Sequence, residues 1–297
     1  MDGQGWLAER FEEHRTHLRT VAYRMLGSVS EADDAVQETW FRLSRSDTGE
    51  VRSLGGWLTT VTARVCLDML RSRASRREEP LGVHVPEPIV SHESGVDPEH
   101  QALLADAVGL ALLVVLDTLA PAERLAFVLH DMFAVPFEEI APIVGRSPAA
   151  ARQLASRARR RVRTAAPVPD ADPARQRTVV DAFLAASHTG DFQALLAVLD
   201  PHVVLRADSG AASAGASREI RGAEAVAEQA LTFSRLARAG GFVRRALVNG
   251  AAGLVQMVRG RVFSVLGFTV TNGKIVAIDI LADPARLRRL DLTVLDD

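Results

Sequence analysis

The sequence predicts a multidomain protein in which two all-α domains precede a domain of the α+β class. Up to residue 165 the chain reads as helices joined by turns. Two proline-containing stretches, 78–98 and 166–173, interrupt that pattern as linkers. After residue 174, helical segments give way to strand-like runs with Asn-Gly turns, which favours a curved antiparallel sheet. The expected domains are residues 1–77, 99–165 and 174–297.

Composition is that of an ordinary globular protein. A length of 297 residues leaves room for two or three domains, and a net charge of −2 means that any affinity for nucleic acid must come from local patches. The single cysteine, Cys66, excludes a disulfide framework within the chain and a multi-cysteine metal site. The polar N-terminus does not resemble a signal peptide, and the longest apolar run, 107–116, is too short to cross a bilayer. We therefore expect a cytoplasmic protein with no membrane partner.

The first domain is expected to hold three helices, at about 6–26, 31–43 and 54–76. Ser30 is expected to cap the second helix. The polar side of this second helix carries Asp33, Asp34, Gln37 and Glu38. Asp34 and Glu38 are four residues apart, and such like-charge pairs cost a few tenths of a kcal/mol. This repulsion favours a docking surface, with a plain solvated helix as the alternative.

The third helix combines an aromatic residue with hydroxyl groups and arginines. Trp57 is among its apolar positions, and the polar positions are Thr59, Thr60, Thr62, Arg64, Asp68, Arg71, Arg73, Arg76 and Arg77. A stacking face beside phosphate-binding groups suits single-stranded DNA. Arginines that increase in number toward a helix C-terminus also complement the helix dipole, and this remains the alternative.

Residues 137–163 predict a helix-turn-helix. Gly145 ends the first helix, and Ser147 with Pro148 begins the second. Small apolar side chains that allow close packing line one face of the second helix: Ala151, Leu154, Ala155 and Ala158. The polar residues that point elsewhere are Arg152, Gln153, Ser156, Arg157 and Arg160. No acidic residue lies between 140 and 168, which together with the turn chemistry favours duplex DNA over a solvated basic helix.

Two further expectations concern the middle of the chain. Pro142 lies inside the first helix of the helix-turn-helix, so we expect a kink or a late start there. Upstream, helices are expected at 99–118 and from Pro121, and the Pro-Glu-Pro stretch at 86–88 should be stiff and extended.

The last domain is expected to mix helices with a meander of strands. Helices are expected at 173–187, 192–199 and 223–237, with a last one beginning near residue 283. Strands are expected at 202–207, 242–249, 253–258, 262–271 and 275–281. A loop rich in glycine, alanine and serine separates the first strand from the third of these helices.

The segments EADDAVQETWFRL, GGWLTTVTARVCLDMLRSR and LAPAERLAFVLHDMFAVPFEEIAPIVGRSPAAARQLASRARRRV resemble bacterial RNA polymerase sigma factors of the extracytoplasmic-function class. The resemblance covers about residues 11–162. It implies that residues 1–77 correspond to region two, which binds core polymerase and the −10 element, and residues 99–165 to region four, which reads the −35 element.

The resemblance also implies roles for single residues. The polymerase-binding face corresponds to Asp33, Asp34, Gln37 and Glu38. The −10 contacts correspond to Trp57, Thr60, Arg64 and Arg71. The −35 contacts correspond to Arg146, Ser147, Arg152, Gln153, Ser156, Arg157 and Arg160.

The C-terminal segment at about 174–291 is similar to the SnoaL-like, or NTF2-like, cone fold, on element order and on the segment DFQALLAVLDPHVVLRAD. Sigma factors with such an extension form a sigma-J-like subgroup. The stretches at 86–88 and NGAAGL at 249–254 resemble motifs of that subgroup. ADSGAASAGAS replaces its usual glycine-rich motif after the first strand, so that motif's role does not carry over directly.

Cones of this kind enclose a pocket that can host acid–base chemistry. Carboxylates and histidines that could serve are Asp181, His188, Asp200, His202, Asp208 and Asp279, with His202 and Asp208 as the possible pocket residues. No metal or nucleotide motif is present, so we expect no cofactor.

Three hypotheses follow. The favoured one is a sigma factor that binds core polymerase and promoter DNA, with a fused regulatory or ligand-sensing domain. That domain would contact the sigma domains within the molecule and take a small-molecule ligand. The second is a SnoaL-like enzyme of the isomerase or cyclase type, fused to a DNA-targeting half. The third is a dimeric helix-turn-helix repressor, which would not need the first 76 residues and for which no heptad seam is visible.

Overall fold

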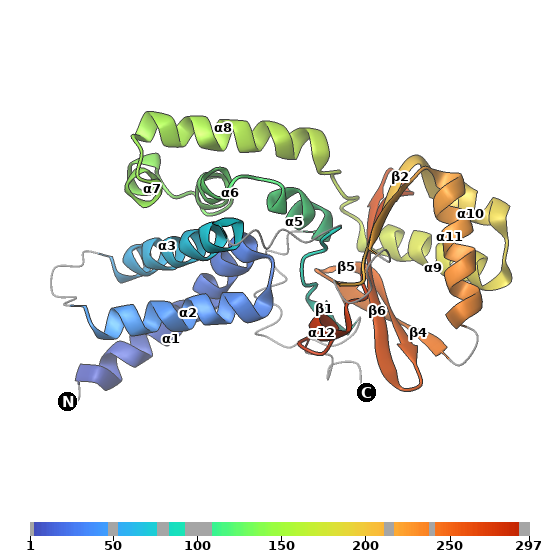
Figure 1. The fold of residues 1–297 in the computed structure, drawn as a ribbon, viewed down its shortest axis with the longest axis horizontal. Helices are drawn as coiled ribbons and strands as arrows, with labels where there is room; N and C mark the ends of the chain where they lie inside the picture. Colours follow the sequence, from blue (N-terminus) through green and yellow to red (C-terminus); the bar gives the residue numbers. More distant parts are fainter. Residues whose placement is uncertain are drawn as a thin grey trace. The chain divides into compact units, whose positions relative to one another are not determined.

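The computed structural model describes residues 3–46, 53–75, 83–92, 109–210, 217–237 and 241–290. They form two compact units, here called the helical unit (Met1–Glu79 with Val115–Ala165) and the sheet unit (Pro80–Val114 with Ala166–Asp297). Figure 1 shows helices throughout the first and a sheet with helices in the second. Most of the expected 78–98 linker thus groups with the sheet unit. The expected helix at 99–118 is described only from residue 109, where α5 (Leu110–Asp117) follows.

The helical unit begins with three helices, α1 (Gly3–Leu26), α2 (Val29–Ser44) and α3 (Leu54–Ser75). Phe11, Leu18 and Leu58 are among the buried residues of their shared core. The prediction that Ser30 caps α2 is wrong. Gly27 turns the chain at φ +70°, which leaves Ser28 extended, and the Ser28 hydroxyl accepts the Glu31 N–H at 3.3 Å. The cap therefore lies two residues earlier than the sequence suggested.

The second half of the helical unit runs through α6 (Pro121–Phe127), a π-helical turn η1 (Val128–Met132), α7 (Phe137–Val144) and α8 (Pro148–Ala165). The predicted turn is present, because Gly145 at φ +68° ends α7 and the Ser147 hydroxyl accepts the Ala150 N–H. The late start expected at Pro142 is wrong, since α7 begins directly after Pro136. Pro142 is exposed, and its missing N–H leaves only the carbonyl of Glu138 without its helical donor.

The described residues of the sheet unit form one sheet of seven strands in the order β1-β4-β5-β6-β7-β2-β3. Their bounds are Val90–Ser91 for β1, Leu199–Asp208 for β2, Arg218–Arg221 for β3, Gly241–Val248 for β4, Ala251–Val258 for β5, Arg261–Thr271 for β6 and Lys274–Leu281 for β7. All neighbours pair antiparallel except β2 and β7, which are parallel. The sheet is thus an antiparallel meander, as predicted, with one parallel pair and two strands, β1 and β3, that were not foreseen.

Helices cover one face of this sheet (Figure 1): α9 (Pro173–Thr189), α10 (Phe192–Val198) and α11 (Ala223–Ala237). A short α12 (Pro284–Leu287) follows β7. The core between these helices and the sheet includes Phe183 of α9, whose ring meets that of Phe268 of β6 at 5.4 Å between centroids. Both predicted Asn-Gly turns are present, with positive φ at both residues as a type I′ turn requires.

Candidate nucleic-acid interface and linker-binding site

The four acidic and amide residues predicted on α2 are all exposed on its outer face. Two of them are already paired: Asp33 with Arg19 at 2.7 Å and Glu38 with Arg42 at 2.9 Å. For Asp34, no partner is found within the described ranges. Among the described residues the face therefore offers one unpaired carboxylate, flanked by two that are partly neutralised by the half-buried Arg19 and the exposed Arg42.

The predicted −10 residues of α3 lie along one side of the helix. Positions 57, 60, 64 and 71 are spaced by three, four and seven residues, which is close to one or two turns of about 3.6 residues each. Arg64 and Arg71 are exposed and make no ion pair with any described residue. Trp57 is half-buried and packs against the core of α1, α2 and α3. The stripe therefore presents two unpaired guanidinium groups, beside a tryptophan that is only partly available for stacking.

Thr60 lines a cavity of about 260 Å³ within the helical unit. His14 and His17 of α1 border the cavity on one side, and Phe133 and Ile143 border it on the other. The His17 and Phe133 rings meet edge to face at 5.3 Å between centroids. Ile143 belongs to α7, the first helix of the helix-turn-helix, so this helix borders the same cavity as the predicted −10 residue Thr60.

The outward face of α8 is set by the burial of Ala151, Ala155 and Ala158. Helical geometry places Gln153, Ser156 and Arg160 opposite these alanines, and all three are exposed. In the described part of the chain, no side-chain partner is found for any of them.

Two other predicted −35 residues on α8 are engaged by the protein itself. Arg157 donates to the Glu123 carboxylate at 2.7 Å, and the Arg152 guanidinium lies 5.3 Å from the centroid of the Phe137 ring. Arg146 is exposed, and Ser147 serves as the helix cap. The centre of this outward face is therefore formed by Gln153, Ser156 and Arg160, with Arg152 and Arg157 at its edges.

The segment Val85–Ser91, here called the strap, is bound to the sheet unit by main-chain pairing. Val90 and Ser91 pair with Val248 and Leu247 of β4. The Ile89 N–H donates to the Asn249 side-chain oxygen at 3.0 Å, and the Asn249 N–H donates to the Ile89 carbonyl at 2.8 Å. Every residue of the strap is buried, so this part of the expected linker is an ordered strand rather than a free connection.

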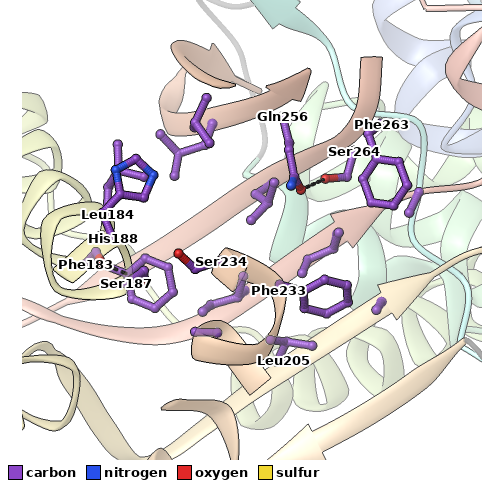
Figure 2. A pocket seen from close by; sticks show the side chains of 18 of the residues that line it. Phe183, Leu184, Ser187, His188, Leu205, Phe233, Ser234, Gln256, Phe263 and Ser264 are labelled. Carbon is purple, nitrogen blue, oxygen red and sulfur yellow. Dashed lines mark hydrogen bonds between the residues drawn. The ribbon is translucent and has the colours of Figure 1, made fainter. Parts of the chain in front are cut away.

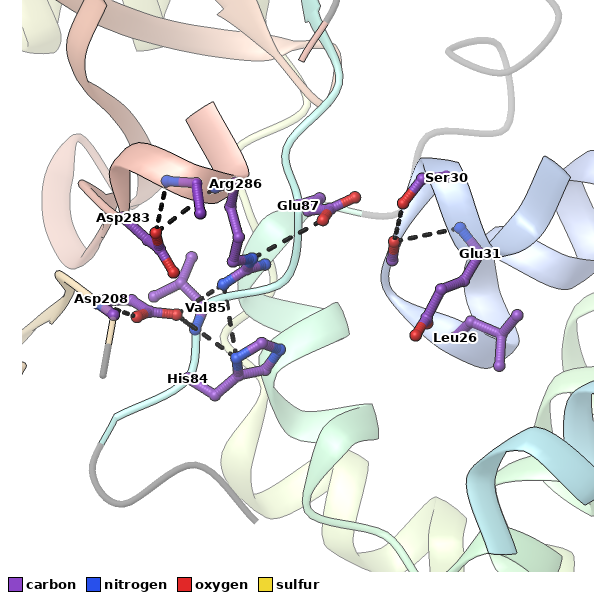
Figure 3. A network of polar contacts seen from close by, with 12 residues as sticks. Leu26, Ser30, Glu31, His84, Val85, Glu87, Asp208, Asp283 and Arg286 are labelled. Atoms are coloured by element: carbon purple, nitrogen blue, oxygen red, sulfur yellow. Dashed lines mark hydrogen bonds and ion pairs between the residues drawn. The ribbon is translucent and has the colours of Figure 1, made fainter. Parts of the chain in front are cut away.

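A buried charge network fixes the other end of the strap (Figure 3). The Asp208 carboxylate at the end of β2 accepts the Val85 N–H at 3.1 Å and an Arg286 N–H at 2.6 Å. Arg286 also lies 3.7 Å from the buried Glu87 carboxylate. Burial alone would raise the pKa of Asp208, but hydrogen bonds from His84 and Val85 and the Arg286 charge together hold it below its usual value.

Two motif-like stretches acquire a physical role in this arrangement. In the Pro-Glu-Pro stretch, Glu87 supplies the carboxylate that meets Arg286. In NGAAGL, Asn249 bonds both polar groups of Ile89. Gly253 of the same stretch has no room for a side chain, because a Cβ there would lie 2.8 Å from the Leu266 carbonyl oxygen and closer still to the Val248 side chain.

The six carboxylates and histidines considered for acid–base chemistry do not converge. Asp181 pairs with Arg245 at 2.5 Å, and Asp200 accepts the N–H of the exposed His202 at 2.8 Å. Asp279 is buried beside Arg206 at 2.9 Å; burial raises the pKa of its carboxyl, and the Arg206 charge opposes that rise. The predicted pocket residues His202 and Asp208 are both wrong, since the first faces solvent and the second is turned toward the strap.

The cavity of the sheet unit lies between the sheet and α9 and α11, and measures about 140 Å³ (Figure 2). Alternate residues of β5, β6 and β7 face it, among them Leu254, Gln256, Leu266 and Ile278. Phe263 and Ser264 both reach it although they are adjacent, because a bulge in β6 breaks the alternation opposite Gln256. Among the described residues that line the cavity there is no carboxylate, arginine or lysine, and His188 is the one histidine.

Within the described residues, no group of three or more histidine, cysteine, aspartate or glutamate side chains could hold a metal ion. Nor is any helix in the described ranges both long enough and apolar enough to cross a membrane.

Comparison with known proteins defines the class of the chain. Residues 10–76 match the family Sigma-70 region 2, and residues 109–162 match Sigma-70, region 4. Two such regions in this order define a sigma-70-type transcription factor.

Relatives similar over nearly the whole chain narrow the class. The ECF RNA polymerase sigma factor SigJ of Mycobacterium tuberculosis H37Rv is 42% identical over 286 residues, which is 92% of this chain and 91% of that protein. The probable ECF RNA polymerase sigma factor SigI of the same species is 36% identical over 275 residues, 92% of each chain. The crystal structure of the M. tuberculosis SigJ matches with a TM-score of 0.77 and 37% identity, over 96% of this chain and 99% of that one.

The chain therefore belongs to the extracytoplasmic-function class of RNA polymerase sigma factors. It binds core RNA polymerase and promoter DNA and directs transcription initiation. This family is not one of enzymes, and the sheet unit is a fused NTF2-like α+β domain. The resemblance found in the sequence is confirmed for both sigma regions and for the extension.

Proposed function

We propose that the sheet unit regulates this sigma factor by binding the segment that joins its two promoter-binding regions. The observation that carries the proposal is the strap, which lies between regions two and four in the sequence yet pairs with β4 and bonds to Asn249 and Asp208. The strap is part of the segment that connects the two regions. A change in the sheet unit that releases or binds the strap would therefore change how freely both regions can move. A contact of the sheet unit with the sigma domains themselves, expected from the sequence, stays a prediction.

Run-off transcription with core polymerase tests the regulatory role. Asn249→Ala removes the acceptor for the Ile89 N–H, and Asn272→Ala is a matched control. Both asparagines begin an Asn-Gly turn and hold φ near +50°, so both changes carry the same backbone cost. Asn249→Ala is expected to change transcript yield while Asn272→Ala leaves it at the wild-type level. Equal yields from both variants would refute regulation through the strap.

The outer face of α2 is proposed to bind core polymerase through Asp33, Asp34, Gln37 and Glu38. Support comes from their common exposure and from the unpaired Asp34. Reversal of two charges, Asp34→Lys with Glu38→Lys, should weaken polymerase binding. The matched control reverses the exposed pair Glu9 and Glu13 of α1, which have the same spacing. If both double variants bind polymerase equally, the docking face lies elsewhere.

The stripe on α3 is proposed to contact the −10 element, with Arg64 and Arg71 on phosphates and Trp57 and Thr60 near the bases. The two arginines are exposed and unpaired among the described residues, which supports a phosphate role. A plot of the logarithm of the −10 strand binding constant against the logarithm of salt concentration has a slope set by the number of phosphate contacts. Each Arg→Ala change should reduce the size of this slope by about one. An unchanged slope would remove the residue from the phosphate-binding set.

The outward face of α8 is proposed to read the −35 element through the seven residues assigned from the sequence. Gln153, Ser156 and Arg160 are available without rearrangement, whereas Arg157 must first leave Glu123. If Arg157 contacts a base, Arg157→Ala should lose about 1–3 kcal/mol of binding free energy on the native −35 sequence and none on sequences in which that base is changed. An equal loss on all sequences would instead make Arg157 a phosphate contact.

Action alongside RNA polymerase implies a cytoplasmic location. A small-molecule ligand for the sheet unit is supported by its enclosed apolar cavity.

A further inference from the structure

We infer that the cavity of the sheet unit binds a small, neutral, mostly apolar molecule that carries one hydrogen-bonding group, and that its occupancy acts on the strap. The inference rests on the proposed regulatory function and names the class of ligand that the same unit would sense. The argument begins with the polar atoms of the cavity, shown in Figure 2.

The Ser234 hydroxyl is the strongest sign of a ligand. Ser234 lies on α11, is 8% exposed and lines the cavity. Its oxygen has no hydrogen-bond partner among the described residues, although buried hydroxyls are nearly always bonded. By contrast, the other α-helical serine of the lining, Ser187, donates to the Phe183 carbonyl at 2.8 Å. Ser234 therefore offers both a donor and an acceptor to whatever occupies the cavity.

A second polar group lies on the sheet. Ser264 donates to the Gln256 side-chain oxygen at 3.0 Å across the β5–β6 pair. This bond orients the amide and leaves the Gln256 Nε2 donor without a partner in the described part of the protein. Apart from these groups the walls are mainly aliphatic and aromatic.

The lining also sets the charge and size of the ligand. The described lining contains no aspartate, glutamate, lysine or arginine, so an ionised ligand would lose its hydration there without an ion pair to replace it. A volume of about 140 Å³ is close to that of an engineered apolar cavity that takes up benzene. The ligand class is therefore a neutral single-ring or short branched molecule with a hydroxyl, carbonyl or similar group.

The end of β2 connects the cavity with the strap. Ala207 and Ser209 line the cavity, while Asp208 between them points to the other side and holds Val85 and Arg286. The Ala282 N–H, from another lining residue, donates to the Asp208 carbonyl at 2.7 Å. A ligand that displaces either neighbour therefore shifts the carboxylate on which one end of the strap depends.

Methyl NMR on the full-length protein tests both steps. The chain has seven isoleucines, and labelling their methyl groups gives reporters in separate places. Ile278 and Ile280 line the cavity, Ile89 lies in the strap, and Ile140 and Ile143 lie in α7 as internal controls. The probes are phenol, toluene and benzoate, which share a ring and differ in one group.

Phenol should shift the Ile278 and Ile280 signals saturably, at concentrations that leave Ile140 and Ile143 unchanged. Toluene should bind more weakly by about 2–12-fold, the value of one hydrogen bond, and benzoate should not bind. Ser234→Ala should weaken the binding of phenol and leave the binding of toluene unchanged. Failure of phenol to shift the cavity signals, or equal binding of all three probes, would overturn the ligand class.

Two substitutions on α11 separate occupancy from folding. Ala230→Leu places a larger side chain into the cavity and should abolish binding of phenol and toluene. Ala225→Leu makes the same change at an exposed position of the same helix, and this variant should bind phenol and toluene as the wild type does. If Ala230→Leu binds phenol as the wild type does, the site lies elsewhere.

The Ile89 signal tests transmission to the strap. It should move as phenol fills the cavity in the wild type and stay fixed in Ala230→Leu. Cavity shifts without movement of Ile89 would refute the link through Asp208 while leaving the ligand site in place. Failure of the proposed regulation is seen separately, in the transcript yield of Asn249→Ala, so the two outcomes cannot be confused.

Discussion

Replacement of Asp208 by asparagine should release the strap while leaving the sheet folded. The Asp208 carboxylate accepts the Val85 N–H, the Gly210 N–H at 3.1 Å and the Arg286 guanidinium, and it also lies 3.4 Å from the His84 ring. An asparagine has one oxygen and one NH₂ group of nearly the same shape. Whichever way it turns, its NH₂ group faces a donor. Among the described carboxylates, Arg286 then keeps Glu87, at 3.7 Å, as a charged partner.

The size of the effect follows from the bonds that are lost. A hydrogen bond that involves an ionised group contributes about 1.5–3 kcal/mol. With about 2 kcal/mol lost from the docked state only, the equilibrium for strap opening should rise about 30-fold. Asp170→Asn is the matched control, since the Asp170 carboxylate accepts two main-chain N–H groups, of Asn272 and Gly273, and does not touch the strap.

Amide hydrogen exchange measures this opening directly. Protection of the Val85 and Ile89 amides should fall about 30-fold in Asp208→Asn and stay at the wild-type level in Asp170→Asn. Protection of Val255, in the middle of β5, should not change in either variant, because the sheet itself remains folded. Wild-type protection at Val85 in Asp208→Asn, or an equal loss in the control, would refute the assignment of Asp208 as the anchor.

The sign of the pH dependence follows from the same network. The pKa of Asp208 is lowered in the docked state from its usual value of 3.8, so the docked state favours the ionised form. Its contribution is fully present above the pKa of the free group and is lost as pH falls through the lowered value. Strap protection should therefore not depend on this group between about pH 5 and pH 8.

Three further variants or measurements test the folded core. Burial raises the pKa of the Cys66 thiol to about 12, so Cys66 should not react with Ellman's reagent at pH 8 until the protein unfolds; rapid labelling of native protein would contradict its burial. The buried Thr39 and Thr62 hydroxyls lie 3.0 Å apart, so Thr39→Val should cost about 1–3 kcal/mol in denaturant unfolding, and the double Thr→Val variant should cost less than the sum of the single changes. Gly253→Ala should lower the free energy of unfolding of the sheet unit by about 1–3 kcal/mol, because the added methyl group overlaps Val248 of β4 and Leu266 of β6. An unchanged unfolding midpoint would show that these two strands move apart enough to accept the methyl group.

Features set by neighbouring residues were predictable from the sequence. The helix-turn-helix depends on Gly145, Ser147 and Pro148, whose conformational preferences act within one turn. The Asn-Gly hairpins depend on the same kind of local chemistry, and their strands were placed to within a few residues. The cap of α2 was misplaced because two serines, Ser28 and Ser30, compete there and the conformation of Gly27 decides between them.

Features that need partners distant in the sequence were not predictable. The strand β1 is two residues long and exists because β4, more than 150 residues away, pairs with it. The cavity lining comes from α9, α11 and five strands, and the β6 bulge that admits Phe263 breaks the alternation on which a sequence pattern depends. Asp208 illustrates the limit well: the sequence marked it as a candidate, but only its contact with Val85 shows which way it points.

The strap also sets how far region two can stand from the sheet unit. Seven residues separate Ser75, the end of α3, from Val83, so the eight Cα steps of this connection reach at most roughly 29 Å while the strap is docked. With the strap released, this docking point would no longer limit the chain that follows Ser75. Docked protein should therefore accept a narrow range of spacings between the −10 and −35 elements, and release of the strap should widen that range.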